Sequence, residues 1–311
     1  MNDLAIRTQS LTRDFKSVRA VDGIELQVPA GTIFGFLGPN GAGKTTTIRL
    51  LLGLLEPTAG RAEVLGFDTR SQGDEIRQRC GALLEHPGLY ERLSAEDNLE
   101  FYGRVWRMPA AERQTRIREL LQAMGLWERR KESAGTWSRG MKQKLAVVRV
   151  LLHRPALIFL DEPTAGLDPL AAAALRDDLA SLAAREGVTV FLTTHNLDEA
   201  EKLCHRVGVI RQGRLLASGP LDELRRQGSA PHLDIRGEGF SESVLAQLGR
   251  RPEVAAVRLQ DGGLRIELAG EYESAPLIGL LVGAGVQVEE VRRSQATLEQ
   301  VFLSLMEEGN G

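Results

Sequence analysis

The chain has 311 residues, and at this length we expect about two domains. Hydrophobic residues make up 42% of it and charged residues 26%, which is typical of a folded globular protein and excludes a disordered one. The net charge of -3 disfavours proteins that bind nucleic acid through charge alone.

The two cysteines, Cys80 and Cys204, form no close pair and have no zinc-site spacing. They predict neither a disulfide nor a metal framework, and they fit a reducing compartment. No run approaches the roughly 18 apolar residues of a membrane-spanning helix. The first ten residues, MNDLAIRTQS, contain no apolar signal-peptide segment. We therefore expect a protein that works from the cytoplasm without a membrane anchor of its own.

Apolar residues that alternate or run continuously predict strands, in chain order, at 4–10, 24–28, 32–37, 157–160 and 188–193. Helical spacing of apolar residues begins at Ile48 and extends to Leu55, which predicts a helix soon after the third strand. Residues 95–152 have a mostly helical pattern. Strands that alternate with helices in this way indicate an α/β fold with a parallel, doubly wound sheet.

The pattern changes in the last third of the chain. We interpret residues 223–230 as a linker after a first domain at 1–222. Residues 231–311 then show the order strand, helix, strand, strand, helix, strand, with a hairpin turn at 261–263. This βαββαβ order is typical of a small ferredoxin-like α+β domain. A capping box at Thr297 and Gln300 predicts one further helix.

A phosphate-binding loop is predicted directly after the strand at 32–37. The pattern G-x-x-x-x-G-K-[ST] is matched by Gly38, Pro39, Asn40, Gly41, Ala42, Gly43, Lys44 and Thr45, and Thr46 follows. Glycines let backbone N–H groups converge on phosphate oxygens, and the start of a helix favours negative charge. We expect Lys44 to reach the β- and γ-phosphates and Thr45 to bind Mg²⁺. An ordinary glycine-rich turn is the alternative, which the strand–loop–helix context disfavours.

Two carboxylates, Asp161 and Glu162, follow the apolar strand at 157–160. Ligands of doubly wound sheets bind at this end of the strands. Asp161 is expected to hold Mg²⁺ with Thr45, and Glu162 to act as general base toward the attacking water. Two solvated acids at a strand end are the alternative, which is common for a strand considered by itself.

With these two motifs, the chain resembles the ATP-binding cassette family of ABC transporters from residue 4 to about residue 220. The segment 138–145, SRGMKQKL, is similar to the signature motif of that family. The resemblance implies a P-loop NTPase cassette with a helical subdomain at about 95–152. It also implies that Ser138 and Gly140 contact the γ-phosphate held by a second cassette, arranged head to tail. Trp137, Arg139 and Met141 depart from the usual LSGGQ sequence, replacing its Leu, first Gly and Gln.

The resemblance implies roles for further residues. Asp168 belongs to a segment similar to the loop that links the two nucleotide sites, and His195 matches the switch histidine that holds the γ-phosphate and the water. Phe15 stands where the family has an aromatic ring that stacks on adenine. Glu85 replaces a glutamine, and we expect it to be a Mg²⁺ ligand and coupling sensor. Residues 86–106 lie where the family grips a helix of the membrane subunit.

The amino-acid sequence of the cassette is similar to that of bacterial drug-resistance exporter ATPases of the daunorubicin and bacitracin type. This resemblance implies a Mg-ATP-hydrolysing subunit that dimerises and drives a separate transmembrane permease from the cytoplasmic face of the membrane. No contact with nucleic acid is expected, and membrane contact is expected only through the permease. One alternative is a soluble ABC ATPase acting on nucleic acid or ribosomes, which the acidic balance disfavours. A small-molecule kinase or GTPase is a second alternative, although no Asn-Lys-x-Asp guanine motif occurs.

Overall fold

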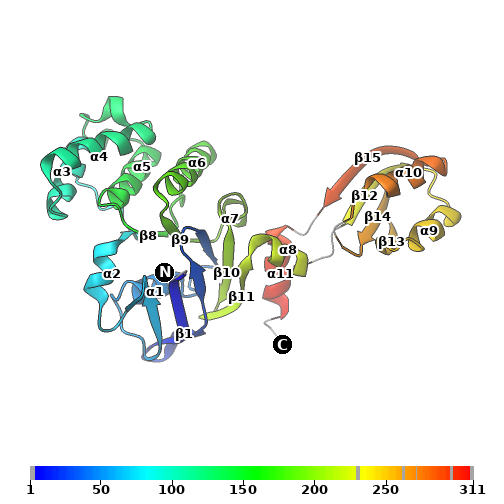
Figure 1. The fold of residues 1–311 in the computed structure, drawn as a ribbon, viewed down its shortest axis with the longest axis horizontal. Helices are drawn as coiled ribbons and strands as arrows, with labels where there is room; N and C mark the ends of the chain where they lie inside the picture. The colour runs from blue at the N-terminus through cyan, green and yellow to red at the C-terminus, as the bar shows by residue number, and fades with distance from the viewer. Residues whose placement is uncertain (1–3, 229–231, 261–262, 271, 295–296, 309–311) are drawn as a thin grey trace. The chain divides into compact units, whose positions relative to one another are not determined.

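The computed structural model describes residues 4–228, 232–260, 263–270, 272–294 and 297–308. The chain divides into two compact units, Met1–Pro220 and Leu221–Gly311. Figure 1 shows the elements of each unit. Among the residues described, no helix combines the length and the apolar character that crossing a membrane requires.

A six-stranded sheet with the order β11-β10-β4-β9-β8-β7 forms the centre of the first unit. Neighbouring strands from β10 to β7 are parallel, and β11 joins the edge antiparallel to β10. Every residue of β4, β8 and β9 is buried, as the continuous apolar runs predict for strands covered on both faces. The strands are β4 Ile33–Leu37, β7 Cys80–Leu83, β8 Leu157–Asp161, β9 Thr189–Thr194, β10 Arg206–Arg211 and β11 Arg214–Pro220.

A second, antiparallel sheet lies in the same unit and contains β1 Leu4–Phe15, β2 Val18–Ile24, β3 Gln27–Pro29, β5 Ala59–Val64 and β6 Phe67–Asp68. The single strand predicted at 24–28 is wrong. β2 ends at Ile24 and β3 begins at Gln27, because the hydroxyl of Thr8 in β1 donates to the carbonyl of Ile24 and accepts the N–H of Leu26.

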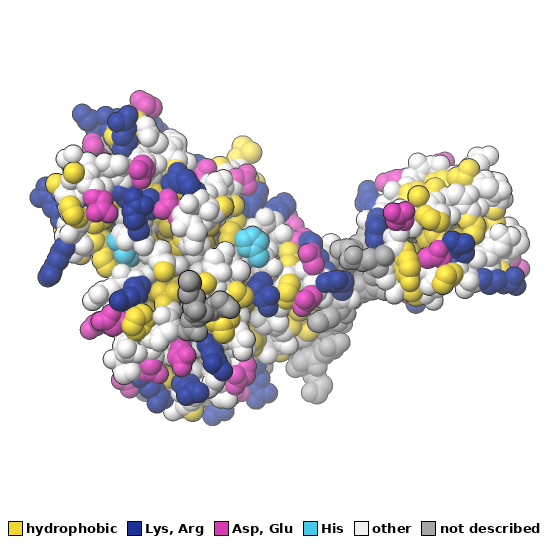
Figure 2. Space-filling view, in the orientation of Figure 1, with side chains coloured by type: hydrophobic (Ala, Val, Ile, Leu, Met, Phe, Trp, Pro, Cys, Tyr) yellow, Lys and Arg dark blue, Asp and Glu magenta, His cyan; other side chains and the backbone are white. Residues whose placement is uncertain are grey.

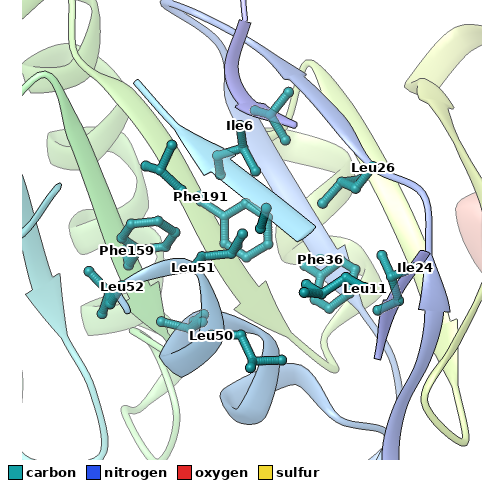
Figure 3. Packing of buried hydrophobic residues seen from close by; sticks show 14 of the residues in the cluster. Ile6, Leu11, Ile24, Leu26, Phe36, Leu50, Leu51, Leu52, Phe159 and Phe191 are labelled. Atoms are coloured by element: carbon teal, nitrogen blue, oxygen red, sulfur yellow. The ribbon is translucent and has the colours of Figure 1, made fainter. Parts of the chain in front are cut away.

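The main hydrophobic core contains side chains of both sheets and of helix α1, Lys44–Leu51. Figure 3 shows Phe36, Phe159 and Phe191 of the parallel sheet near leucines of α1 and aliphatic side chains of the second sheet. The helix predicted to reach Leu55 ends at Leu51 instead. Gly53 follows with a φ of +63°, a conformation that a right-handed helix does not contain.

The region predicted to be helical at 95–152 is confirmed as a group of helices: α3 Ala95–Val105, α4 Ala110–Ala123, two short 3₁₀ turns at Trp127–Arg129 and Ala134–Thr136, and α5 Arg139–Leu151. Figure 1 shows α3, α4 and α5 gathered at one end of the unit. The remaining helices of this unit are α2 Gly73–Arg79, α6 Pro169–Glu186 and α7 Leu197–Leu203. The loops between β8 and α6 and between β9 and α7 begin at the carboxyl ends of neighbouring parallel strands, so the topology brings them together.

The second unit contains a four-stranded antiparallel sheet with the order β13-β14-β12-β15. Its elements follow the order βαββαβ, as the sequence predicts, and their apolar faces form a separate core. They are β12 His232–Glu238, α9 Glu242–Gly249, β13 Val254–Gln260, β14 Gly263–Leu268, α10 Ala275–Gly283 and β15 Gln287–Ser294. The predicted turn at 261–263 lies largely outside the described residues.

Two further helices of this unit, α8 Leu221–Gly228 and α11 Leu298–Glu308, pack against each other. Residues 223–228 of the predicted linker are therefore helical. The capping box is confirmed, because the N–H of Thr297 donates to Gln300 Oε1 at 3.1 Å and the N–H of Gln300 donates to Thr297 Oγ1 at 3.3 Å. Chain segments on either side of the βαββαβ region thus meet as a helix pair.

Candidate active site

A cleft of about 870 Å³ opens in the first unit at the carboxyl ends of the parallel strands. It is lined by most of the predicted phosphate loop, by both predicted carboxylates, by the loop after β7 and by the first turns of α5. Its lining includes Gly43, Lys44, Thr45, Glu85, Arg139, Asp161 and Glu162. The structure therefore brings together motifs that lie more than a hundred residues apart in the sequence.

The backbone of the phosphate loop requires glycine at defined positions. Gly43 has a φ of +106°, and a Cβ there would lie 2.4 Å from the carbonyl oxygen of Ala20. A Cβ on Gly38 would lie 2.3 Å from the carbonyl oxygen of Ile210. Helix α1 begins directly after Gly43, so its free N–H groups and positive dipole end lie at the cleft. This is a backbone arrangement that suits a phosphate group.

Lys44 is buried, with 6% of its surface exposed. Its ammonium group donates to the carbonyl oxygens of Gly38 at 2.7 Å and Pro39 at 3.3 Å. It also pairs with Glu162 Oε1 at 3.0 Å. A buried ammonium held by carbonyls and one carboxylate is a fixed positive charge at the loop, available to a phosphate that competes with Glu162.

Thr45 and Asp161 place two oxygen atoms side by side. The Thr45 hydroxyl donates to Asp161 Oδ2 at 2.7 Å, and the other carboxylate oxygen of Asp161 accepts from the hydroxyl of Thr193. A hydroxyl and a carboxylate are ligands that suit Mg²⁺, which completes its octahedron with phosphate oxygens and waters. The described residues contain no group of three His, Cys, Asp or Glu side chains that could hold a metal. With phosphate oxygens as further ligands, this hydroxyl–carboxylate pair suits Mg²⁺.

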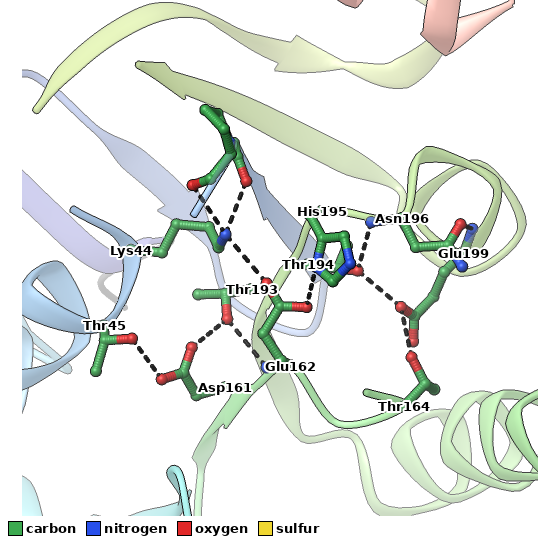
Figure 4. Close-up of polar contacts among 12 residues, drawn as sticks. Lys44, Thr45, Asp161, Glu162, Thr164, Thr193, Thr194, His195, Asn196 and Glu199 are labelled. Atoms are coloured by element: carbon green, nitrogen blue, oxygen red, sulfur yellow. Dashed lines mark hydrogen bonds and ion pairs between the residues drawn. The ribbon is translucent and has the colours of Figure 1, made fainter. Parts of the chain in front are cut away.

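Glu162 lies between two partners, as Figure 4 shows. Its Oε1 pairs with Lys44, and its Oε2 lies 2.8 Å from Nδ1 of His195. The backbone of Glu162 has a φ of +50°, unusual for a residue with a side chain, and its N–H donates to the carbonyl and the hydroxyl of Thr193, each at 3.1 Å. The turn aims the carboxylate into the cleft, where it could accept a proton.

Sequence reasoning missed the polar groups that support this turn. Thr193 anchors both carboxylate residues, and its only sequence signal is a hydroxyl at the end of a buried strand. Glu199, four residues after His195, is 4% exposed and accepts hydrogen bonds from Thr164 and Thr194, each at 2.8 Å. Burial raises the pKa of Glu199, and the two hydroxyl groups oppose that shift.

Among the described residues that line the cleft, the signature segment contributes Arg139, Lys142 and Gln143, but neither Ser138 nor Gly140. The Ser138 hydroxyl caps α5 by accepting the N–H of Met141 at 3.3 Å. The guanidinium of Arg139 lies against Gly166, in the loop before α6, where a Cβ would be only 2.3 Å from it.

Three other predicted site residues have different surroundings. Asp168 caps α6, accepting the N–H groups of Leu170 at 3.1 Å and Ala171 at 2.9 Å. Phe15 is 39% exposed at the end of β1, with a guanidinium stacked 4.6 Å from its ring centre. Within the described cleft lining, neighbouring residues 18–20 take part and Phe15 does not. Glu85 borders the cleft, but its carboxylate pairs with Arg49 at 2.8 Å.

The region expected to meet a membrane subunit exposes a group of aromatic and aliphatic side chains. Tyr90 packs edge-on against Phe101, with ring centres 4.9 Å apart. Tyr90, Phe101, Val105 and Trp106 are all between 36% and 60% exposed. Elsewhere, Figure 2 shows positive and negative side chains interspersed over the visible face of each unit.

Comparison with known proteins places this site in a family. Residues 21–165 match the ABC transporter family. The chain is 36% identical to the bacitracin transport ATP-binding protein of Bacillus licheniformis, over 97% of each chain. It is 35% identical to the daunorubicin/doxorubicin resistance ATP-binding protein of Streptomyces peucetius, over 97% of this chain and 92% of that protein.

A solved structure titled as an ATP-binding subunit of an ABC transporter matches 72% of this chain and 92% of its own, with 32% identity and a TM-score of 0.64. The family match at residues 21–165 includes the phosphate loop and both carboxylates. The chain therefore belongs to the family of ABC transporter ATP-binding proteins, the ATP-hydrolysing subunits of these transporters.

Proposed function

We propose that this chain powers an exporter that removes antibiotic-like, amphiphilic compounds from a bacterial cell. The observation that carries the proposal is the chain of contacts that runs from Lys44, in the cleft, through Glu162 to His195. The choice of cargo class is supported by the relatives that match almost the whole chain, whose names refer to bacitracin transport and daunorubicin resistance.

In the proposed reaction the phosphate loop and Lys44 bind the β- and γ-phosphates of ATP. Thr45 and Asp161 would hold Mg²⁺, which would neutralise negative charge on the phosphates. Lys44 exchanges its contact with Glu162 for the phosphate, and Glu162 is then free to accept a proton from the attacking water. His195 supports the Glu162 carboxylate through Nδ1. The residues act by positioning and by fixed charge.

We further propose that two copies of this chain assemble head to tail. Ser138 and Gly140 sit at the start of α5, where free N–H groups favour an anion, and Ser138 is exposed. Because neither residue lines the cleft of its own chain among the described residues, we assign them to the nucleotide of the second copy.

The permease is proposed to bind at the exposed side chains of Tyr90, Phe101, Val105 and Trp106, at the cytoplasmic face of the membrane. A helix of the permease that presents apolar side chains would cover this group. Glu85 lines the cleft and precedes Tyr90, the first residue of this exposed group, by only five residues in the sequence. It is therefore placed to transmit movement of the permease to the nucleotide.

The test is reconstitution. The tagged chain is purified from detergent-solubilised membranes together with its membrane partner, and the complex is placed in liposomes that contain a self-quenching dye or daunorubicin. We expect ATP-dependent movement of the drug, and none from a complex that carries Glu162→Gln. An ATPase that co-purifies with ribosomes or RNA, and with no membrane protein, would contradict the proposal.

A further inference from the structure

The buried carboxylate of Glu199 binds the chain segments that follow Glu162 and precede His195. Glu199 is the third residue of α7, and only 4% of it is exposed. Its Oε2 accepts the hydroxyl hydrogens of Thr164 and Thr194, each at 2.8 Å. Figure 4 shows this carboxylate reaching from α7 to both hydroxyl groups. One oxygen atom thus joins the loop after β8 to the last residue of β9.

Both threonines are close in sequence to reacting groups. Thr164 comes two residues after Glu162, and Thr194 comes directly before His195. The Thr194 hydroxyl also accepts the N–H of Asn196 at 3.0 Å. The side chain of Asn196 in turn accepts the N–H of Glu199 at 3.2 Å. The loop that carries His195 is therefore closed onto Glu199 by side-chain and main-chain hydrogen bonds.

The turn at Glu162 needs such support. A residue with a side chain rarely adopts a φ of +50°, and it persists only where the surrounding structure holds it. Thr193 holds the N–H of Glu162 on one side. Thr164, anchored on Glu199, holds the chain that leaves the turn on the other side.

Burial of a carboxylate costs free energy. We therefore expect the benefit of Glu199 to come from the two threonine hydroxyl groups that it binds. The charged groups that act on it are Glu162, which repels it, and Arg176, which attracts it. Burial raises the pKa of Glu199 above its ordinary value, while the two threonine hydroxyls favour the charged form. An apolar side chain of similar size would fill the space but could not accept either hydroxyl.

We infer that Glu199 is a positioning residue that fixes the distance between Glu162 and His195 by binding Thr164 and Thr194 through one oxygen atom. The contact it maintains is the 2.8 Å approach of His195 Nδ1 to Glu162 Oε2. The inference rests on the proposed function in one respect only, namely that Glu162 and His195 act together in ATP hydrolysis.

The experiment compares steady-state ATP hydrolysis by the purified full-length chain and its variants. Glu199→Ala should lower kcat by about 10- to 100-fold, because a displacement of about 1 Å at a reacting group has an effect of this size. The KM for ATP should change by less than about threefold, because the phosphate loop is untouched. Glu199→Gln keeps an oxygen that accepts both hydroxyls, so it should recover most of the loss in kcat.

The two threonines supply matched controls that do not alter the carboxylate. Thr164→Val and Thr194→Val each remove one hydroxyl at nearly constant volume and should each lower kcat. Thr164→Ser and Thr194→Ser keep the hydroxyl and should stay close to wild type. Because both contacts end on the same oxygen, the double valine variant should be about as slow as Glu199→Ala.

Thermal unfolding of every variant separates positioning from folding. If Glu199→Ala does not fold, the two valine variants carry the test alone. The inference is overturned if kcat of the valine variants equals that of the serine variants, or if kcat and ATP affinity fall together in all of them. A wild-type chain without ATPase or transport activity would instead refute the proposed function, whatever the variants do.

Discussion

Replacement of Glu162 by glutamine removes the proposed general base with little change in shape. The glutamine oxygen can still accept from Lys44, 3.0 Å away, and its amide can donate to Nδ1 of His195, 2.8 Å away. The local contacts therefore survive, and only the negative charge and the ability to take a proton are lost.

The expected effect on turnover follows from the lost proton transfer. A positioned general base contributes about 10²- to 10⁴-fold to a rate, which corresponds to about 3–5 kcal/mol of transition-state stabilisation. The effect on binding has the opposite sign. Glu162 and the nucleotide compete for the ammonium of Lys44, and a neutral amide competes less well than a carboxylate. Glu162→Gln should therefore bind ATP as tightly as wild type or more tightly.

The assay measures phosphate release at saturating Mg-ATP, binding of a fluorescent ATP analogue, and the ATP-dependent dimer by size-exclusion chromatography. Glu85→Gln is the matched control, because it makes the same chemical change in the same cleft. The Glu85 side chain is 60% exposed and pairs with Arg49, so we expect its variant to retain substantial activity with an altered Mg²⁺ requirement. Near-normal turnover of Glu162→Gln would refute the base assignment. Equal loss in both variants would show that two carboxylates share the role.

Three other predictions concern assembly and stability. Chains carrying Ser138→Ala and chains carrying Lys44→Ala should each be inactive, and mixing them should restore one of two composite sites; absence of recovery would argue against assembly in trans. Glu186→Leu removes the carboxylate nearest to the buried guanidinium of Arg116, which keeps only the Leu151 carbonyl at 3.0 Å and Glu119 at 3.8 Å, and should cost about 3 kcal/mol in urea unfolding, whereas adding Arg116→Met should recover much of that loss. Truncation after Gln227 removes α11 and should lower the melting temperature more than a deletion of β12–β15 that rejoins α8 to α11; both should still bind ATP.

Local sequence patterns were sufficient for the central elements of the fold and for the reacting groups. Continuous apolar runs identify β4, β8 and β9 because these strands are buried on both faces. Short motifs identify Lys44 and Glu162 because phosphate chemistry requires those residue types directly after buried strands. Helix ends were harder to predict, since the apolar spacing continues to Leu55 although Gly53 has already turned the chain.

Ion pairs between residues that are distant in the chain could not be predicted from the sequence. Glu85 and Arg49 lie 36 residues apart, and only the fold brings their charged groups to 2.8 Å. The carboxylate that we expected beside the metal ligands is thereby drawn to a guanidinium. The Mg²⁺ dependence of ATP hydrolysis by Glu85→Gln tests directly for a contact between Glu85 and Mg²⁺.

Substitutions at different residues in and around the cleft should have different effects on ATP binding and on kcat. Lys44 and Thr45 are proposed to contact the phosphates or the cation in both the bound and the reacting state, so their loss should weaken ATP binding first. The described hydrogen bonds of the Glu199 side chain are to the protein hydroxyl groups of Thr164 and Thr194, close in sequence to Glu162 and His195. Substitutions there should reduce kcat while ATP binding persists. Glu199, Thr164 and Thr194 therefore form a second set of positions, outside the sequence motifs, at which substitutions should change the rate of ATP hydrolysis without changing the affinity for ATP.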